Sequence, residues 1–142
     1  MKKGIDTLIK LRKRALDELR RSLASLENQK AQLKNVSARL EEELQREIKL
    51  AATQPEMGNF FGDFAKRIKN RQQEIADEIK ALDKKMDKLS QEISEAYSEL
   101  KKFEIVHENT KKREAAELNR KETIALDEIA GQQHQRKQTE DS

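Results

Sequence analysis

The sequence contains no cysteine and only two histidines, His107 and His134, in 142 residues. Without cysteine the chain forms no disulfide, no reactive thiolate and no cysteine-type zinc site. Two histidines this far apart are too few for a convincing histidine metal site or for a serine–histidine relay. We therefore predict no metal site, and the absences already argue against several common kinds of enzyme.

Glycine is scarce, with four residues in the chain, and no pair of them has the spacing of a phosphate-binding loop. Carboxylates are abundant, but carboxylates on exposed helices lack the desolvation that tunes a general acid or base. The sequence therefore predicts no catalytic residue, no cofactor-binding residue, no cofactor and no enzymatic activity. We expect no small-molecule partner.

Long apolar runs are missing as well. No stretch approaches the roughly 18 residues that a membrane span needs, and the basic start lacks the apolar run of a signal peptide. The chain is therefore expected to be soluble and cytoplasmic. Because only 35% of its residues are hydrophobic and 40% are charged, a compact interior would have to bury unpaired charge, so an elongated fold or a disordered chain is expected.

The few helix-breaking residues outline two long helices. Glycine costs about 1 kcal/mol and proline about 3 kcal/mol inside a helix, so long intervals without them indicate helices. The breakers are Gly4, Pro55, Gly58, Gly62 and Gly131. Residues 1–130 are predicted to form a single helical hairpin, with helices over 5–52 and 63–130 and a turn over 53–62. Gly62 and Asp63 could cap the start of the second helix. Residues 131–142 are predicted to form a flexible tail.

A heptad pattern runs along both predicted helices and excludes disorder. On the first helix, position a holds Ile9, Leu16, Leu23, Leu44 and Ala51, and position d holds Ile5, Leu19, Leu26, Leu33 and Leu40. On the second, position a holds Ala65, Ile79, Met86, Ile93 and Leu100, and position d holds Phe61, Ile68, Ile75, Leu82, Leu89, Ala96 and Phe103. The predicted fold is all-α, a long two-helix antiparallel coiled-coil hairpin, in which residue i faces roughly residue 115 − i.

Polar residues interrupt this apolar seam. They are Arg12, Lys30 and Ser37 on the first helix and Gln72, His107 and Thr110 on the second. Long side chains can reach out of a narrow seam and small polar ones can fix its register, which is the interpretation we favour over a buried ligand site. His107 could instead form a pH-sensitive contact. The exposed remainder of the stripe could also drive dimerisation into a four-helix assembly.

Three of the four phenylalanines, Phe60, Phe61 and Phe64, cluster beside the predicted turn. Phe61 and Phe64 could simply seal the end of the hairpin. Phe60 is harder to bury because the tip of a two-helix hairpin has little interior. We therefore predict an exposed aromatic cluster, which is typical of a protein-binding surface.

The other end of the hairpin is predicted to be basic. Lysine and arginine outnumber acidic residues over 1–21 and over 111–121, although the whole chain has a net charge of only +3. Charge of this kind steers an acidic protein surface towards it, and also suits phospholipid or nucleic acid. The candidate docking residues are Arg12, Lys13, Arg14, Lys111, Lys112 and Arg113.

Several segments together resemble the flagellar export protein FliJ as seen in alphaproteobacteria. Residues 6–13 and 16–21 are similar to the opening of that family, and residues 95–104 resemble the segment before its charged last helix. The charged pattern Arg113-Glu114, Arg120-Lys121-Glu122 and residues 126–130 also fits. The resemblance covers about residues 5–130.

The resemblance implies a small component of the flagellar type III protein export apparatus, required for motility and similar in shape to the central stalk of rotary ATPases. Its implied partners are the hexameric export ATPase, the membrane-embedded export gate and export chaperones. The basic residues above would dock on the ATPase, and Phe60, Phe61 and Phe64 on the gate. The implied location is the cytoplasmic face of the inner membrane, where the protein would associate peripherally.

Two other functions stay open from the residues alone. An unrelated coiled-coil adaptor or chaperone would share the same heptads, and a basic helical arm could bind nucleic acid. No aromatic residue is interleaved with the basic residues, which weakens the nucleic-acid alternative. We therefore expect no nucleic-acid partner.

Overall fold

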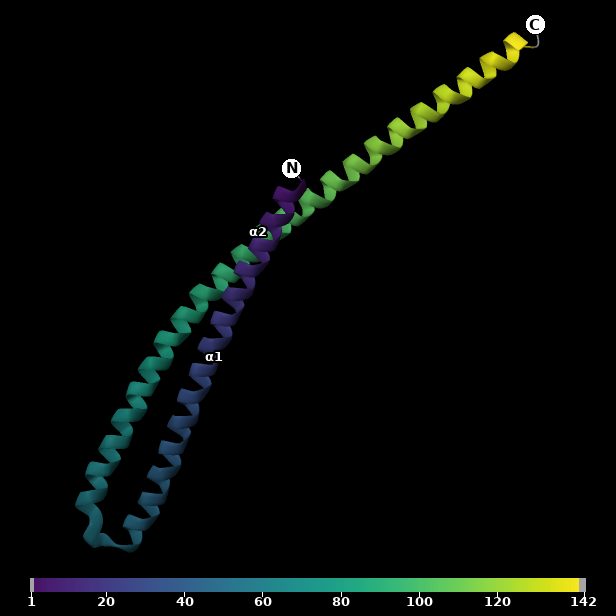
Figure 1. Ribbon diagram of the computed structural model, residues 1–142. Coiled ribbons are helices and arrows are strands. Elements are labelled where there is room, and N and C mark those ends of the chain that lie inside the picture. The colour runs from purple at the N-terminus through teal and green to yellow at the C-terminus, as the bar shows by residue number, and fades with distance from the viewer. Residues whose placement is uncertain (1, 141–142) are drawn as a thin grey trace. The chain divides into compact units, whose positions relative to one another are not determined.

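A computed structural model describes the backbone of residues 2–140 and all their side chains except those of Lys2, Lys3 and Met57. Helix α1 spans Lys2–Thr53, a short 3₁₀ turn spans Pro55–Met57, and helix α2 spans Gly58–Glu140. The described residues contain no strand, and α1 and α2 run antiparallel (Figure 1). The predicted all-α coiled-coil hairpin is confirmed.

The chain divides into two compact units. Arg12–Tyr97 forms what we call the hairpin unit, which contains the turn. Met1–Leu11 and Ser98–Ser142 form the end unit. Each unit contains part of the antiparallel pairing, because each holds residues from both helices.

The predicted seam is the core of both units. Every apolar residue assigned above to position a or d is buried or half-buried. In the hairpin unit the most buried are Leu16, Leu44, Ile68, Ile75 and Leu82, and in the end unit they are Ile9 and Leu100. A repeat of 3.5 residues keeps one stripe of each helix turned towards its partner, so the period itself selects the buried side chains.

Polar seam residues of the hairpin unit make specific contacts across the two helices. Lys30 Nζ donates to Asp83 Oδ1 at 2.6 Å. Gln72 Nε2 donates to Glu41 Oε2 at 3.0 Å and lies 3.4 Å from the Ser37 carbonyl oxygen. Such paired polar groups favour a single register, because a sliding helix would leave each of them without its partner. Arg12, also at a d position, is exposed.

Glu41 gives the pairing a dependence on pH. The hydrogen bond from Gln72, followed by one from Gln45, lowers the pKa of Glu41 below its ordinary value of 4.5. A carboxyl whose pKa is lower in the folded state stabilises the fold above its unfolded pKa, and this stabilisation is lost as the pH falls through the folded pKa. We expect Glu41→Gln to lose less stability than the wild type between neutral pH and about pH 3.

Urea unfolding at the two pH values measures this effect. Glu42→Gln is the matched control, since Glu42 is exposed and makes no hydrogen bond with another described residue. If Glu41→Gln and Glu42→Gln show the same pH dependence, the Glu41–Gln72 hydrogen bond does not contribute to it.

The turn is shorter than predicted. Gln54, with φ −133° and ψ 80°, is the one residue between α1 and the 3₁₀ turn, and it lies outside the α-helical region, which is disfavoured before proline. Gly58 then adopts right-handed helical angles, φ −57° and ψ −36°, and its N–H donates to the Pro55 carbonyl. Because the helix is already under way at Gly58, the predicted start at residue 63 and the cap by Gly62 and Asp63 are wrong.

In the end unit, His107 and Asp6 meet across the two helices. His107 Nε2 lies 2.8 Å from Asp6 Oδ1, and the His107 side chain is only 12% exposed. The two atoms are close but not aligned as a hydrogen bond. His107 and Thr110 are both half-buried, so the heptad positions that face α1 continue to Thr110, even though the residues at these positions are polar.

Beyond Thr110, the side chains of α2 are exposed to solvent along the rest of the described helix. Every described residue from 111 to 140 is exposed, and the helix continues through Gly131 to Glu140, past the predicted end at 130. A β-carbon added at Gly131 would meet no atom within 4 Å, and glycine costs only about 1 kcal/mol there, so one glycine need not stop the helix. The flexibility of residues 131–142 stays a prediction.

Candidate docking surfaces

At the tip of the hairpin unit, α1 ends at Thr53 with two hydrogen bonds to one carbonyl oxygen. Thr53 Oγ1 donates to the Leu50 carbonyl at 2.8 Å, and the Gln54 N–H donates to the same oxygen at 3.1 Å. These two bonds satisfy a carbonyl that the end of a helix would leave unpaired. Pro55 then starts the 3₁₀ turn, which leads directly into α2. The turn therefore places the phenylalanine cluster on the first turns of α2.

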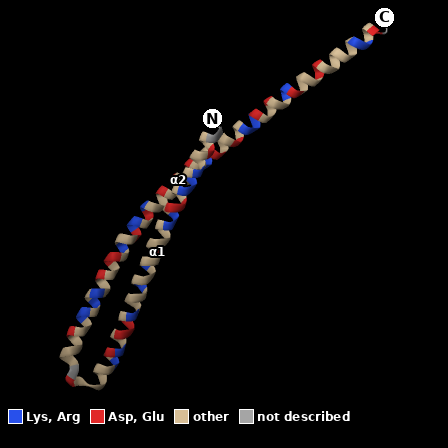
Figure 2. Ribbon diagram, viewed as in Figure 1, with Lys and Arg blue, Asp and Glu red and all other residues tan. Residues whose placement is uncertain are grey.

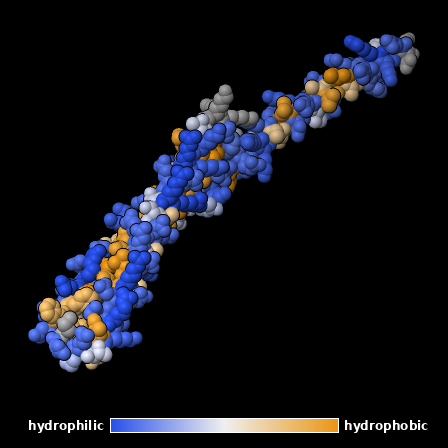
Figure 3. Space-filling view, turned by 60° about the horizontal axis from the view of Figure 1, so that its bottom comes forward, coloured by the Kyte–Doolittle hydropathy of each residue, from blue (hydrophilic) through white to orange (hydrophobic). Residues whose placement is uncertain are grey.

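The three phenylalanines are not equivalent. Phe61 occupies the d position of α2 that is nearest the turn, and its side chain is half-buried. Phe64, about one helical turn further along α2, is half-buried as well. Phe60 is 75% exposed, the highest exposure among the large hydrophobic residues of the described chain. Figure 3 shows apolar atoms gathered at this tip, at the lower left of the view. The predicted exposed ring at the tip is therefore present, and it is Phe60.

A groove lies between the two helices at the tip, with a volume of about 200 Å³. Its lining is Glu47, Leu50, Ala51, Phe60, Phe61, Phe64 and Arg67. The lining combines apolar side chains with one acid from α1 and one base from α2. We call it the tip groove.

Sequence reasoning found the three rings of the tip groove but missed Glu47, Leu50 and Arg67. The signal was available, because the antiparallel pairing rule sets the residues just before the turn against those just after the rings. The spacing of Glu47, Leu50 and Ala51 at i, i+3 and i+4 then puts them on one face of α1.

The six candidate basic residues are all exposed. Arg12, Lys13 and Arg14 belong to the hairpin unit, whereas Lys111, Lys112 and Arg113 belong to the end unit. Apart from Arg12, none of the six forms an ion pair with another described residue. Figure 2 shows basic and acidic residues interspersed along both helices. The shared docking role of these six residues stays a prediction.

Further exposed apolar side chains lie on α2 beyond Thr110. Leu118, Leu126 and Ile129 are between 52% and 67% exposed. Ala115, Leu118, Leu126 and Ile129 lie within one helical face by their spacing. These residues were not among the candidate docking residues predicted from the sequence.

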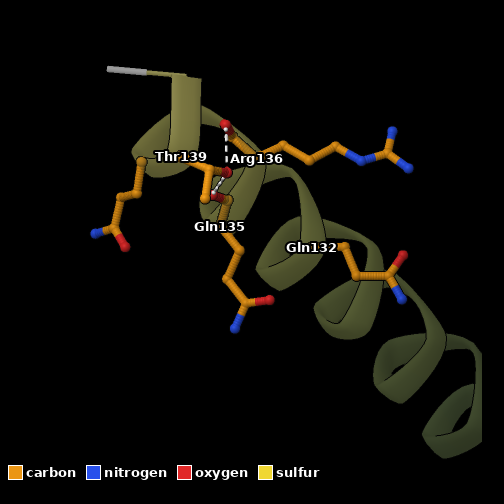
Figure 4. A pocket seen from close by; sticks show the side chains of 5 residues that line it. Gln132, Gln135, Arg136 and Thr139 are labelled. Carbon is orange, nitrogen blue, oxygen red and sulfur yellow. Dashed lines mark hydrogen bonds between the residues drawn. The ribbon is translucent and has the colours of Figure 1, made fainter. Parts of the chain in front are cut away.

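The side chains at the C-terminal end of α2 do not form a binding site. Gln132, Gln135, Arg136 and Thr139 project from one helix in different directions (Figure 4). Thr139 Oγ1 donates to the Gln135 and Arg136 carbonyls at 2.7 Å and 3.1 Å. No second element closes this region, so the space beside the helix is open to solvent.

Neither a membrane span nor a metal cluster is found in the part of the chain that the structure describes. Its helices lack a stretch apolar and long enough to cross a bilayer. Within the same residues, no three side chains among histidine, cysteine, aspartate and glutamate come together as ligands for an ion.

The fold defines a two-helix coiled-coil hairpin protein. The model of the flagellar FliJ protein family matches residues 1–139, nearly the whole chain, and the chain belongs to that family. The family consists of non-catalytic, cytoplasmic components of flagellar protein export, so this chain is a flagellar export component. The chain has no significant match among curated proteins or solved structures.

Proposed function

We propose that this chain acts as a stalk that docks on the export ATPase ring through its basic segments and on the export gate through its tip. It hydrolyses nothing itself but couples the ring to the gate during delivery of flagellar subunits. In this proposal the protein works at the cytoplasmic face of the inner membrane, held there by the gate. The basic docking residues are Arg12, Lys13, Arg14, Lys111, Lys112 and Arg113.

The observation that carries the proposal is the presence of two exposed surfaces of different chemistry in a family of export components. Within the hairpin unit, Lys13 and Arg14 lie at the open end and Phe60 at the turn. Cations without an intrachain ion pair favour fast, salt-sensitive encounter with an acidic surface. An exposed aromatic ring beside a groove favours a short-range apolar contact.

The first test is the rate of ATP hydrolysis by the export ATPase, with and without this protein, at low and moderate salt. Because exposed charges steer encounter while contributing only about 0–1 kcal/mol to stability, we expect Lys13→Glu with Arg14→Glu to slow association by about 10-fold or more at low salt without unfolding the protein. Lys84→Glu with Lys85→Glu is the matched control, since both lysines are exposed in the same unit.

Separate reversal of Lys111 and Lys112 shows whether the end unit contributes to the same docking. Unchanged stimulation in the Lys13 and Arg14 variant, at both salt concentrations, would move the docking site elsewhere. A wild-type protein that fails to stimulate the ATPase would contradict the stalk proposal.

A second candidate function is an adaptor for export chaperones or other clients. The exposed Leu118, Leu126 and Ile129 favour it, because an exposed apolar helix face accepts a partner helix. An adaptor of this kind would bind chaperones without changing the rate of ATP hydrolysis, which distinguishes it from the stalk.

A further inference from the structure

The tip carries both a projecting ring and a groove of matching size. Phe60 is 75% exposed at the edge of the tip groove, whose volume is about 200 Å³. An apolar cavity of about 150 Å³ accepts a benzene molecule, so the tip groove has room for one aromatic ring. We propose that the tip binds the tip of a second copy of this chain, with Phe60 of each copy seated at the tip groove of the other.

The charges of the tip groove complement each other under a two-fold axis. Glu47 comes from α1 and Arg67 from α2, and neither forms an ion pair with another described residue. A two-fold interface uses the same patch twice, so the patch must be complementary to itself. The arrangement that sets α1 of one copy against α2 of the other pairs Glu47 with Arg67 twice. The arrangement that sets α1 against α1 brings like charges together.

The charges of Glu47 and Arg67 also disfavour a partner surface that carries charge of only one sign. A wholly acidic segment would leave Glu47 opposed by like charge, and a wholly basic segment would do the same to Arg67. A second tip satisfies both groups and brings its own exposed Phe60. The second copy is therefore the occupant that matches the acid, the base and the apolar lining of the groove together.

The patch is small, so the association is weak. Interfaces below about 1,200 Å² in total belong to weak and transient complexes, and we expect a dissociation constant on the order of 100 µM. While two tips are bound, Phe60 is covered and is not available to any other protein. Self-association therefore limits the tip's access to other partners when the protein is locally concentrated.

Sedimentation velocity on the full chain over a range of concentrations tests the proposal through a charge-swap pair. We expect Glu47→Arg alone and Arg67→Glu alone to remain monomeric at concentrations where the wild type associates. Mixed in equal amounts, the two variants should associate with each other, because one then presents two bases to the two acids of the other. Circular dichroism of each variant shows that its helices are retained.

Leu126→Ala tests the competing apolar face instead, since Leu126 is an exposed leucine of the end unit, outside the tip. Its self-association should equal that of the wild type. A wild-type protein that stays monomeric up to about 1 mM would overturn the proposal. Two further results would do the same: failure of the mixed variants to associate, or loss of association in Leu126→Ala alone. In these cases the tip groove serves another protein, or association uses the part of α2 beyond Thr110.

Discussion

Replacing Ile75 by alanine is expected to lower the free energy of unfolding by about 2–4 kcal/mol. Ile75 is 1% exposed and is the only described side chain below 2% exposure. The loss combines the transfer free energy of the removed atoms with the cavity they leave between two helices that cannot collapse freely. Urea unfolding followed by circular dichroism measures the change.

Ile48→Ala is the matched control for Ile75→Ala, since it makes the same chemical change in the same unit. Ile48 is 41% exposed, so less apolar area is lost, and alanine's better helix propensity offsets part of the cost. We expect a change within about 1 kcal/mol for Ile48→Ala. If the two variants lost equal stability, burial at Ile75 would not be what holds the hairpin unit together.

Phe60→Ala is expected to weaken binding to the export gate by about 30-fold and to reduce motility, while the melting temperature stays nearly unchanged. The ring is 75% exposed, so its removal gives up little buried area within the chain. Phe61→Ala, by contrast, removes a half-buried seam residue and should lower stability by about 1–3 kcal/mol. Gate binding is measured at protein concentrations well below those used for self-association, so that the tip is free.

The comparison of Phe60→Ala with Phe61→Ala separates a docking ring from a structural one. If Phe60→Ala destabilised the tip as much as Phe61→Ala, Phe60 would be a structural plug. The contact with the gate would then have to be sought along the polar flanks of the hairpin. Loss of motility with intact gate binding would place the function of Phe60 in another step of export.

The heptad pattern predicted the core because its physical cause is local. A 3.5-residue repeat determines which side chains face the partner helix whatever the details of packing, and so Ile75 and Leu82 could be identified without a structure. The turn was less predictable. Gly58 and Gly62 were interpreted as helix-breaking residues. A glycine, however, costs only about 1 kcal/mol inside a helix, and the packing of two long helices against each other stabilises the fold by more than that.

The candidate docking surfaces were predicted in part. The exposure of Phe60 followed from the small interior of a two-helix tip. The contribution of Glu47 and Arg67 to the groove could also have been found from the antiparallel pairing, whose observed register is fixed by contacts such as Lys30 with Asp83. For the basic residues, the sequence established their charge but could not fix how Arg12–Arg14 and Lys111–Arg113 are placed in space.

Residues that pair across the seam are separated by a longer segment of chain the further they lie from the turn. Gln72 and Glu41 are 31 residues apart in sequence, and Lys30 and Asp83 are 53 apart. Because the entropy of closing a loop rises only with the logarithm of its length, pairs near the turn form first and each further pair adds little cost. We therefore expect the hairpin unit to close from its turn and to open from its other end, so that the segment of Arg12–Arg14 separates from α2 before the rings beside the turn separate from α1.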